Sequence, residues 1–210
     1  MKYLVVHIAN AFNTLPWTTV KEALKFHGIP KYLRQIVADY LLERTIMYPT
    51  RNGWEDSPMI YGVPQGSVLG PLLWNIGYDW VLRGANLGGV EQVCYADDTL
   101  LIARGRTYKV AALLATIGVE DVVGRIRKLG LEVALQKSEA MCFHGPRKAP
   151  PPRSSLSISG ISIGVESTMK YLGLVLDSRW NFKEHFNRLA PHRSSRSIEP
   201  TTTECRRTEC

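Results

Sequence analysis

The stretch Val93–Ala103, which reads VCYADDTLLIA, constrains the fold of this chain more than any other. Two apolar runs, Val93–Tyr95 and Leu100–Ile102, flank the adjacent carboxylates Asp97 and Asp98. Because Asp favours turns and the flanking residues favour strands, the pattern predicts a β-hairpin with both acids at its tip. Crowded carboxylates resist ionising together unless a cation neutralises them, so this hairpin is suited to hold Mg²⁺. The alternative is a solvated Asp-Asp turn that binds nothing.

The chain has 210 residues, of which 45% are hydrophobic and 21% charged, and this composition indicates one ordinary globular domain with room for a small appendage. A net charge of +7 is compatible with a polyanionic partner but does not require one. The 4 cysteines show no CxxC spacing, so we expect neither a disulfide framework nor a zinc site, and an intracellular location, nuclear or cytoplasmic. No apolar run approaches the length of a membrane span, so no membrane partner is expected.

The first part of the chain predicts a buried strand followed by two helices. Tyr3–Ile8 is a nearly continuous apolar run, as in a central strand buried on both faces. Thr19 and Glu22 form a capping-box pattern that predicts a helix start, and Gly28 predicts its end. Lys31–Glu43 carries one apolar stripe at helical spacing.

The middle of the chain predicts a hairpin, a loop and a third helix. Arg44–Tyr48 and Pro58–Tyr61 are expected strands around Asn52-Gly53, a dipeptide that favours tight hairpin turns. The Gly- and Pro-containing run Gly62–Pro71 is the expected loop. It leads into an apolar helix over Leu72–Leu82.

The remaining elements mix helix and strands, and hairpins interrupt any simple parallel order. The fold class expected is therefore α+β rather than doubly wound α/β. The elements expected here are a helix over Tyr108–Leu129, an extended segment over Leu131–Phe143, a hairpin of Leu156–Ile158 with Ile161–Ile163, a strand over Lys170–Leu176 and a short amphipathic piece over Trp180–Phe186.

Four sequence motifs that occur in a fixed order are much more informative together than any one of them alone. They are HIANAF (7–12), GVPQGSVLGPLLWN (62–75), YADDTLL (95–101) and the pair QKSE and KYLG (136–139 and 170–173). Together they resemble the reverse transcriptase domain of non-LTR retrotransposons over about Val5–His185. The resemblance implies a polymerase palm-like antiparallel sheet with packed helices. It also implies an RNA-directed DNA polymerase whose partners are an RNA template, a DNA primer and a dNTP.

The resemblance implies a two-metal centre in which Asp97 and Asp98 hold two Mg²⁺ ions. A third acidic ligand is expected where this chain has His7, and a neutral imidazole is a poor ligand for a hard cation. His7 is then either an inert strand residue or a weak substitute ligand.

The resemblance also implies substrate-binding and catalytic roles for other residues. Phe12 would exclude a ribose 2′-OH, Gln65 and Gly66 would approach the incoming nucleotide and template, and Lys137 would protonate the leaving pyrophosphate. Tyr171-Leu172-Gly173 resembles a primer-grip hairpin. The ordinary alternatives are a core aromatic at Phe12, a solvated surface lysine at Lys137 and a plain packed strand at residues 171–173.

With this resemblance, the chain divides into a partial reverse transcriptase palm (1–143), a Pro/Arg-rich linker (144–155), a small β-rich primer-grip-like extension (156–188) and a disordered tail (189–210). We expect a truncated copy with its fingers partly missing, because the resemblance opens at the motif that begins the palm. The alternative function is a catalytically inactive remnant that at most binds nucleic acid. A metal-dependent phosphohydrolase would leave GVPQGSVLGPLLWN unexplained.

Overall fold

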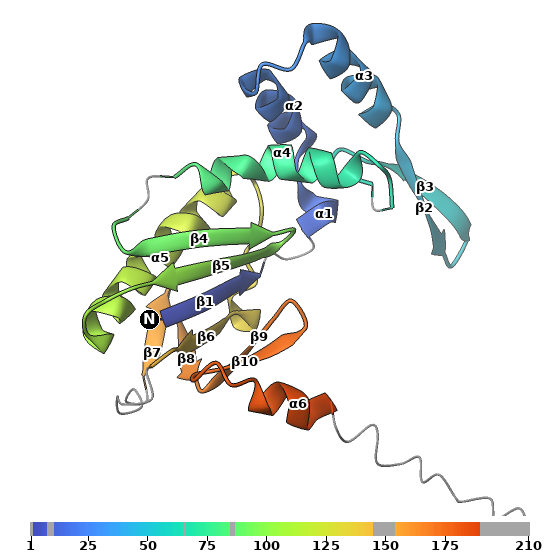
Figure 1. Ribbon diagram of the computed structural model, residues 1–210. Coiled ribbons are helices and arrows are strands. Elements are labelled where there is room, and N and C mark those ends of the chain that lie inside the picture. Colours follow the sequence, from blue (N-terminus) through green and yellow to red (C-terminus); the bar gives the residue numbers. More distant parts are fainter. Residues whose placement is uncertain (1, 8–10, 65, 85–86, 145–153, 190–210) are drawn as a thin grey trace, which may run out of the picture.

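The computed structural model describes residues 2–7, 11–64, 66–84, 87–144 and 154–189, and its centre is a six-stranded sheet (Figure 1). In spatial order the strands are β4 (Val90–Tyr95), β5 (Asp98–Ala103), β1 (Lys2–His7), β6 (Glu139–Cys142), β8 (Ile161–Glu166) and β7 (Ser155–Ile158). All neighbouring pairs are antiparallel except β6 and β8. The strand predicted at the start of the chain is confirmed, and it lies in the middle of the sheet.

Helices and a mostly antiparallel sheet combine in this fold, so the α+β class is confirmed. In chain order the helices are α1 (Ala11–Thr14), α2 (Trp17–Phe26), α3 (Lys31–Leu41), α4 (Gly70–Leu82), α5 (Tyr108–Lys128), the 3-10 turn η1 (Leu135–Lys137) and α6 (Lys183–Leu189). The long helix α5 crosses behind the sheet in Figure 1 and contacts β5, β1 and β7. Residues from α2, α4 and α5 form one buried core with β5, β6, β7 and β8, which we call the helix-side core.

Strand β5 is buried on both faces. Leu101 and Ala103 belong to the helix-side core, whereas Leu100 belongs to a second cluster with Met141, Phe143, Met169 and Leu176, which we call the hairpin-side cluster. This second cluster lies under β9 (Thr168–Tyr171) and β10 (Leu174–Asp177), which pair with each other in a separate two-stranded sheet. Double burial explains why Leu100–Ile102 is apolar throughout rather than alternating.

The hairpin in the middle of the chain forms, but its second strand was predicted wrongly. The strands are β2 (Thr45–Thr50) and β3 (Gly53–Pro58), not Pro58–Tyr61, and they project away from the main sheet (Figure 1). Thr50 pairs with Gly53, so Arg51 and Asn52 are the turn residues. The Thr50 hydroxyl accepts a hydrogen bond from the Asn52 N–H (3.3 Å) and donates one to the Gly53 carbonyl (2.8 Å), which closes the turn one residue earlier than expected.

The predicted capping box is also wrong. Helix α2 begins at Trp17 after Pro16, and the Thr19 hydroxyl instead donates to the Leu129 carbonyl at 3.5 Å. Two further short elements were missed: α1 occupies an expected turn, and η1 interrupts the segment expected to be extended. Helices as short as these, with four and three residues, are not stable alone and depend on tertiary contacts that the local sequence does not reveal.

The helices expected over Lys31–Glu43 and Leu72–Leu82 are confirmed with small shifts of their ends. Strand β8 pairs with β6, so the 156–163 hairpin continues the main sheet, while the domain boundaries themselves stay a prediction. Most of the expected linker (145–153) and nearly all of the expected tail (190–210) lie outside the described residues. Within the described ranges, no helix is long and apolar enough to span a membrane.

The double burial of β5 gives a stability prediction. Leu101 is 1% exposed in the helix-side core, so Leu101→Ala should lower the free energy of unfolding by about 2–5 kcal/mol. The matched control is Leu113→Ala on α5, where the side chain is 61% exposed, and it should change stability by about 0.5 kcal/mol or less. Urea denaturation measures both. Similar losses in the two variants would contradict this description of the core.

Candidate active site

Three neighbouring strands have an end on the same side of the sheet, and two of the predicted site residues, His7 and Asp98, lie at these strand ends. Strand β1 ends at His7, β5 begins at Asp98 and β6 begins at Glu139. The register pairs His7 with Asp98 and Val5 with Glu139, so all three strand ends lie at the same edge. The prediction that His7 and the acidic turn lie on neighbouring strands is confirmed. The predicted distance between the His7 and Asp97 side chains concerns a side chain outside the described part of the chain.

The predicted hairpin is confirmed, but only Asp97 lies in its turn, because Asp98 is the first residue of β5. Tyr95 pairs with Asp98, which leaves Ala96 and Asp97 as the turn residues. Ala96 has φ of 52°, a left-handed conformation that costs an L-residue roughly 1–2 kcal/mol. Asp97 and Asp98 are half-buried, so their carboxylates stand at the boundary between protein and solvent.

Helix α4 holds this turn from the helix side. The Trp74 indole Nε1–H donates to the Ala96 carbonyl at 2.9 Å, and the Tyr78 hydroxyl bonds the Thr99 hydroxyl at 2.7 Å. The Trp74 and Tyr78 rings stack with centroids 5.2 Å apart. Burial raises the pKa of the Tyr78 hydroxyl well above its usual range, so this group keeps its proton. Sequence reasoning missed both residues, although two aromatics four apart on a predicted helix were a usable signal.

The GVPQGS loop is tied to α1 by backbone hydrogen bonds. The Gly62 N–H donates to the Leu15 carbonyl (2.8 Å), and the Val63 N–H donates to the Phe12 carbonyl (2.6 Å). Gly62 has φ of 86°, and a Cβ there would lie 2.9 Å from Cα of Asn13. The glycine is therefore required by a close backbone approach.

Phe12 stands between that loop and the acidic turn. Its ring is half-buried, with its centroid 4.9 Å from that of Trp74. Gly66, farther along the loop, has φ of 80°, and open space surrounds the position of a Cβ there. Gln65 lies outside the described residues. The structure thus places Phe12 in the aromatic group that supports Ala96.

Lys137 and Tyr171 come from the C-terminal half of the chain. Lys137 is the exposed last residue of η1, two positions before β6, and so lies near the same edge of the sheet. Burial raises the pKa of the Tyr171 hydroxyl, and the negative charge of Asp98 raises it further. Tyr171 packs against the hairpin-side cluster that contains Leu100, two residues after Asp98, so the hairpin of β9 and β10 lies beside the start of β5. Leu172 and Gly173 form the turn of this hairpin, with φ of 48° and 81°.

The two carboxylates are a donor set that suits Mg²⁺. This ion is commonly bound by one or two carboxylates, with waters and substrate phosphates completing its shell. Asp97 and Asp98 supply hard oxygen atoms on a turn held by strands and by α4. Among the described residues, no group of three or more His, Cys, Asp or Glu side chains is arranged to hold a metal ion.

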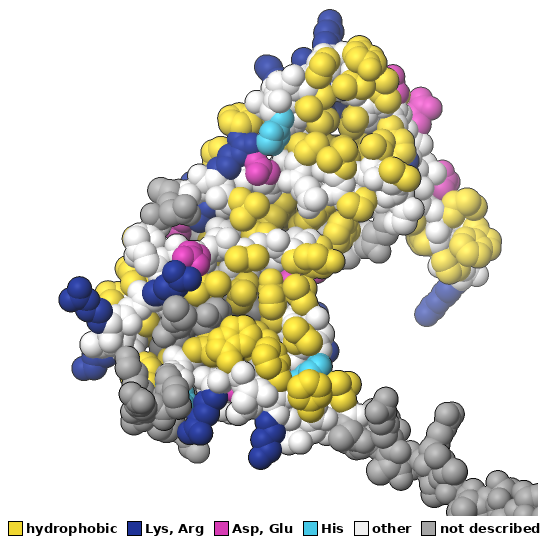
Figure 2. Space-filling view, in the orientation of Figure 1, with side chains coloured by type: hydrophobic (Ala, Val, Ile, Leu, Met, Phe, Trp, Pro, Cys, Tyr) yellow, Lys and Arg dark blue, Asp and Glu magenta, His cyan; other side chains and the backbone are white. Residues whose placement is uncertain are grey.

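The molecule is hollowed at this edge of the sheet. Figure 2 shows the recess between the part carrying α4 with β2 and β3 and the part carrying β9, β10 and α6, with many hydrophobic side chains on the face around it. Exposed apolar residues bordering the motifs include Tyr61, Val68, Leu72, Tyr95, Leu172 and Leu174.

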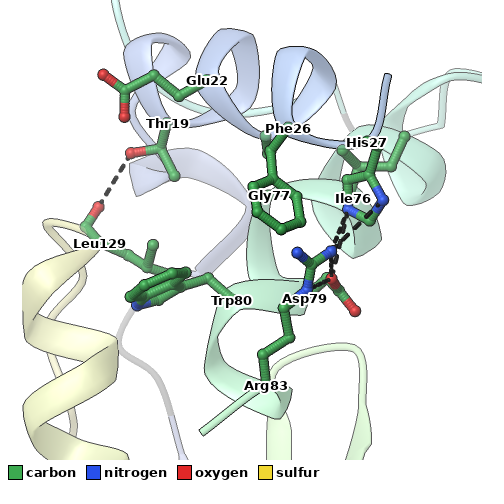
Figure 3. Close-up of a pocket in the computed structure, with 11 residues that line it drawn as sticks. Thr19, Glu22, Phe26, His27, Ile76, Gly77, Asp79, Trp80, Arg83 and Leu129 are labelled. Atoms are coloured by element: carbon green, nitrogen blue, oxygen red, sulfur yellow. Dashed lines mark hydrogen bonds and ion pairs between the residues drawn. The ribbon is translucent and has the colours of Figure 1, made fainter. Parts of the chain in front are cut away.

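A separate cavity of about 250 Å³ lies on the other side of α4 (Figure 3). Phe26, Ile76 and Trp80 are among its apolar walls, and Arg83 pairs with Asp79 at one end. On a helix, residues 76, 80 and 83 lie opposite residues 74 and 78. The cavity therefore contains none of the predicted site residues.

Comparison with known proteins identifies the family. A family model described as reverse transcriptase (RNA-dependent DNA polymerase) matches residues 2–176. The probable RNA-directed DNA polymerase from transposon X-element of Drosophila melanogaster is 34% identical over 130 residues, covering 59% of this chain and 14% of that protein. A Pol polyprotein from the type-1 retrotransposable element R1 of Bradysia coprophila is 24% identical over 189 residues, covering 89% and 18%. This chain thus spans less than a fifth of the length of these relatives.

Solved structures support the fold. A telomerase from Candida tropicalis, in complex with a fragment of telomeric RNA, matches with a TM-score of 0.54 and 12% identity over 84% of this chain and 28% of that one. The apo telomerase from the same organism, truncated from its C-terminal domain, gives a TM-score of 0.50. At this identity the likeness concerns the fold alone, and it confirms the expected palm-like architecture. The family match covers most of the chain, and with it the order of motifs, the acidic hairpin and the retrotransposon relatives place this chain in the reverse transcriptase family, among the non-LTR retrotransposon enzymes.

Proposed function

We propose that this chain carries the nucleotidyl-transfer centre of a retrotransposon RNA-directed DNA polymerase, which extends a DNA primer along an RNA template. One observation carries the proposal: the Asp97-Asp98 turn lies at the sheet edge where β1 ends, and the helix of the GVPQGSVLGPLLWN motif holds it. Family membership supports the reaction class, and carboxylates on a turn fixed by its neighbours suit a reaction that needs divalent cations.

The reaction is attack of the primer 3′-OH on the α-phosphorus of a dNTP, with pyrophosphate leaving. Asp97 and Asp98 are the residues that would hold Mg²⁺, which when bound neutralises the charge that develops on the entering and leaving oxygens. The Lys137 ammonium would donate a proton to pyrophosphate. Phe12 would close the space beside the sugar, and Gln65 and Gly66 would contact the nucleotide and template.

The nucleic-acid partners are supported by charge and by family. The chain carries a formal charge of +7, which favours binding of phosphate backbones. The telomerase with a similar fold was solved with a fragment of telomeric RNA. We infer that the recess beside the acidic turn is where template and primer meet. The β9–β10 turn at Leu172-Gly173 would grip the primer, because the preceding Tyr171 packs against the cluster that contains Leu100, two residues after Asp98.

One observation favours a second candidate function, a catalytically inactive remnant that binds nucleic acid only. The register places His7 directly opposite Asp98, at the position where the family resemblance puts an acidic ligand. A neutral imidazole supplies no charge to balance a divalent cation, and its nitrogen is a poorer ligand than oxygen for Mg²⁺. The weakened metal site would lower catalysis without changing the net positive charge of the chain.

One prediction of the proposed function concerns His7. This chain covers only 18% of the R1 relative, so the test uses a fusion protein in which the R1 segment preceding the matching region is attached to the N-terminus of this chain. With Mg²⁺ and an RNA template, the unchanged fusion should extend a primer at least on the order of a hundredfold more slowly than its His7→Asp variant, since a misplaced reacting oxygen alone costs that much. Adding Asp97→Ala to His7→Asp should abolish extension. Equal rates with His7 and Asp at this position would show that the imidazole is tolerated.

The second prediction concerns the choice of sugar. In the same His7→Asp fusion, Phe12→Val should raise incorporation of ribonucleotides relative to deoxyribonucleotides, because a smaller side chain leaves room for a 2′-OH. The matched control is Phe26→Val, whose ring is exposed and lies in the separate cavity behind α4. The ratio of kcat/KM for UTP and dTTP measures the effect. An unchanged ratio in Phe12→Val would assign Phe12 to packing alone.

A further inference from the structure

We propose that Trp74 is a positioning residue: its indole holds the Ala96 carbonyl and thereby fixes the direction in which Asp97 leaves the turn. This inference rests on the proposed function, because it assigns to Trp74 the alignment of the acidic pair. In this role Trp74 acts through the turn and not by contact with substrate or metal.

The first step of the argument is the backbone of the turn. Ala96 is one of only two residues between β4 and β5, and it has φ of 52°. An L-residue in that conformation is unfavourable, so something must compensate. The hydrogen bond from Trp74 Nε1 to the Ala96 carbonyl, 2.9 Å long, acts on the peptide group that joins Ala96 to Asp97. Its loss would remove a constraint on that peptide plane.

The second step is the rigidity of Trp74 itself. The side chain is 1% exposed and its ring lies between two others, those of Phe12 at 4.9 Å and Tyr78 at 5.2 Å. Tyr78 in turn bonds Thr99, the residue after Asp98. Two hydrogen bonds from one face of α4 therefore hold the residue just before Asp97 and the residue just after Asp98.

The third step connects the turn with the nucleotide side of the site. The Val63 N–H donates to the Phe12 carbonyl, and the Phe12 ring contacts Trp74. One continuous set of contacts thus runs from the GVPQGS loop through Phe12 and Trp74 to Ala96. Any displacement of Trp74 would reach both the carboxylates and the ring proposed to read the sugar.

The experiment measures binding of Mn²⁺, used alone as a paramagnetic substitute for Mg²⁺, to the full chain by electron paramagnetic resonance. The variant Trp74→Phe keeps an aromatic ring and removes the Nε1–H donor. It should raise the dissociation constant of the site that Asp97→Asn abolishes by about threefold to tenfold, the range expected for one lost hydrogen bond. Amide exchange of the 95–99 segment should become faster in the same variant.

Two further variants separate positioning from stability. Trp80→Phe makes the same change on the opposite face of α4, where the ring is 51% exposed, and should leave Mn²⁺ affinity unchanged. Ala96→Gly relieves the left-handed strain, so combined with Trp74→Phe it should restore most of the affinity. A core residue without a positioning role would lower the unfolding temperature in Trp74→Phe, leave the affinity unchanged and show no rescue.

Each outcome decides the matter. Loss of affinity in Trp74→Phe with rescue by Ala96→Gly supports the inference. Equal affinity in the unchanged chain and Trp74→Phe overturns it and leaves the proposed function standing. Absence of any Asp97-dependent Mn²⁺ binding by the unchanged chain overturns both this inference and the metal-binding part of the proposed function.

Discussion

Burial of β5 on both faces is the constraint on which the rest of this structure depends. Leu101 and Ala103 pack against the helices, and Leu100 packs against the layer formed by β9 and β10. Side chains alternate along a strand, so a slip of one residue would exchange these two sets and place each against the wrong layer. The register of β5 is therefore strongly determined, and with it the point at which Asp97 and Asp98 leave the sheet. Packing in the helix-side core and the hairpin-side cluster thereby fixes the position of the acidic pair.

The candidate site depends on contacts among segments far apart in the sequence. Phe12 follows the first strand, Trp74 belongs to the helix after the GVPQGS loop, and Ala96 belongs to the acidic turn, yet a ring contact and a hydrogen bond join the three. Each such hydrogen bond contributes only about 1 kcal/mol net, so none of them holds the fold together. Their value is directional, because they fix where a peptide plane or a ring lies. The left-handed backbone at Ala96, and again at Leu172, comes from the two-residue hairpin turns in which both residues lie.

His7 changes the electrostatics of the site without changing its architecture. The β1–β5 register requires only backbone groups, and these are the same for His and Asp. The sheet can therefore form with an imidazole at a position where a carboxylate would strengthen cation binding. Under the proposed function, fold and activity are separable at this residue: the backbone register places it opposite Asp98, while its side chain would decide how well the acidic pair holds a divalent ion.

The sequence by itself determined the acidic hairpin, the apolar character of β1 and β5, the helix after the GVPQGS loop and the order of motifs that indicates the family. These follow from local periodicity, turn chemistry and residue types, which act over a few positions. Sequence could not place α2's start or the β3 strand, because Thr19 bonds Leu129 and Thr50 closes its turn early. Tertiary structure alone decided that Trp74 reaches Ala96 and that Tyr78 reaches Thr99. The physical reason is that these bonds join residues 22 and 21 positions apart, whose approach depends on how α4 packs across the sheet.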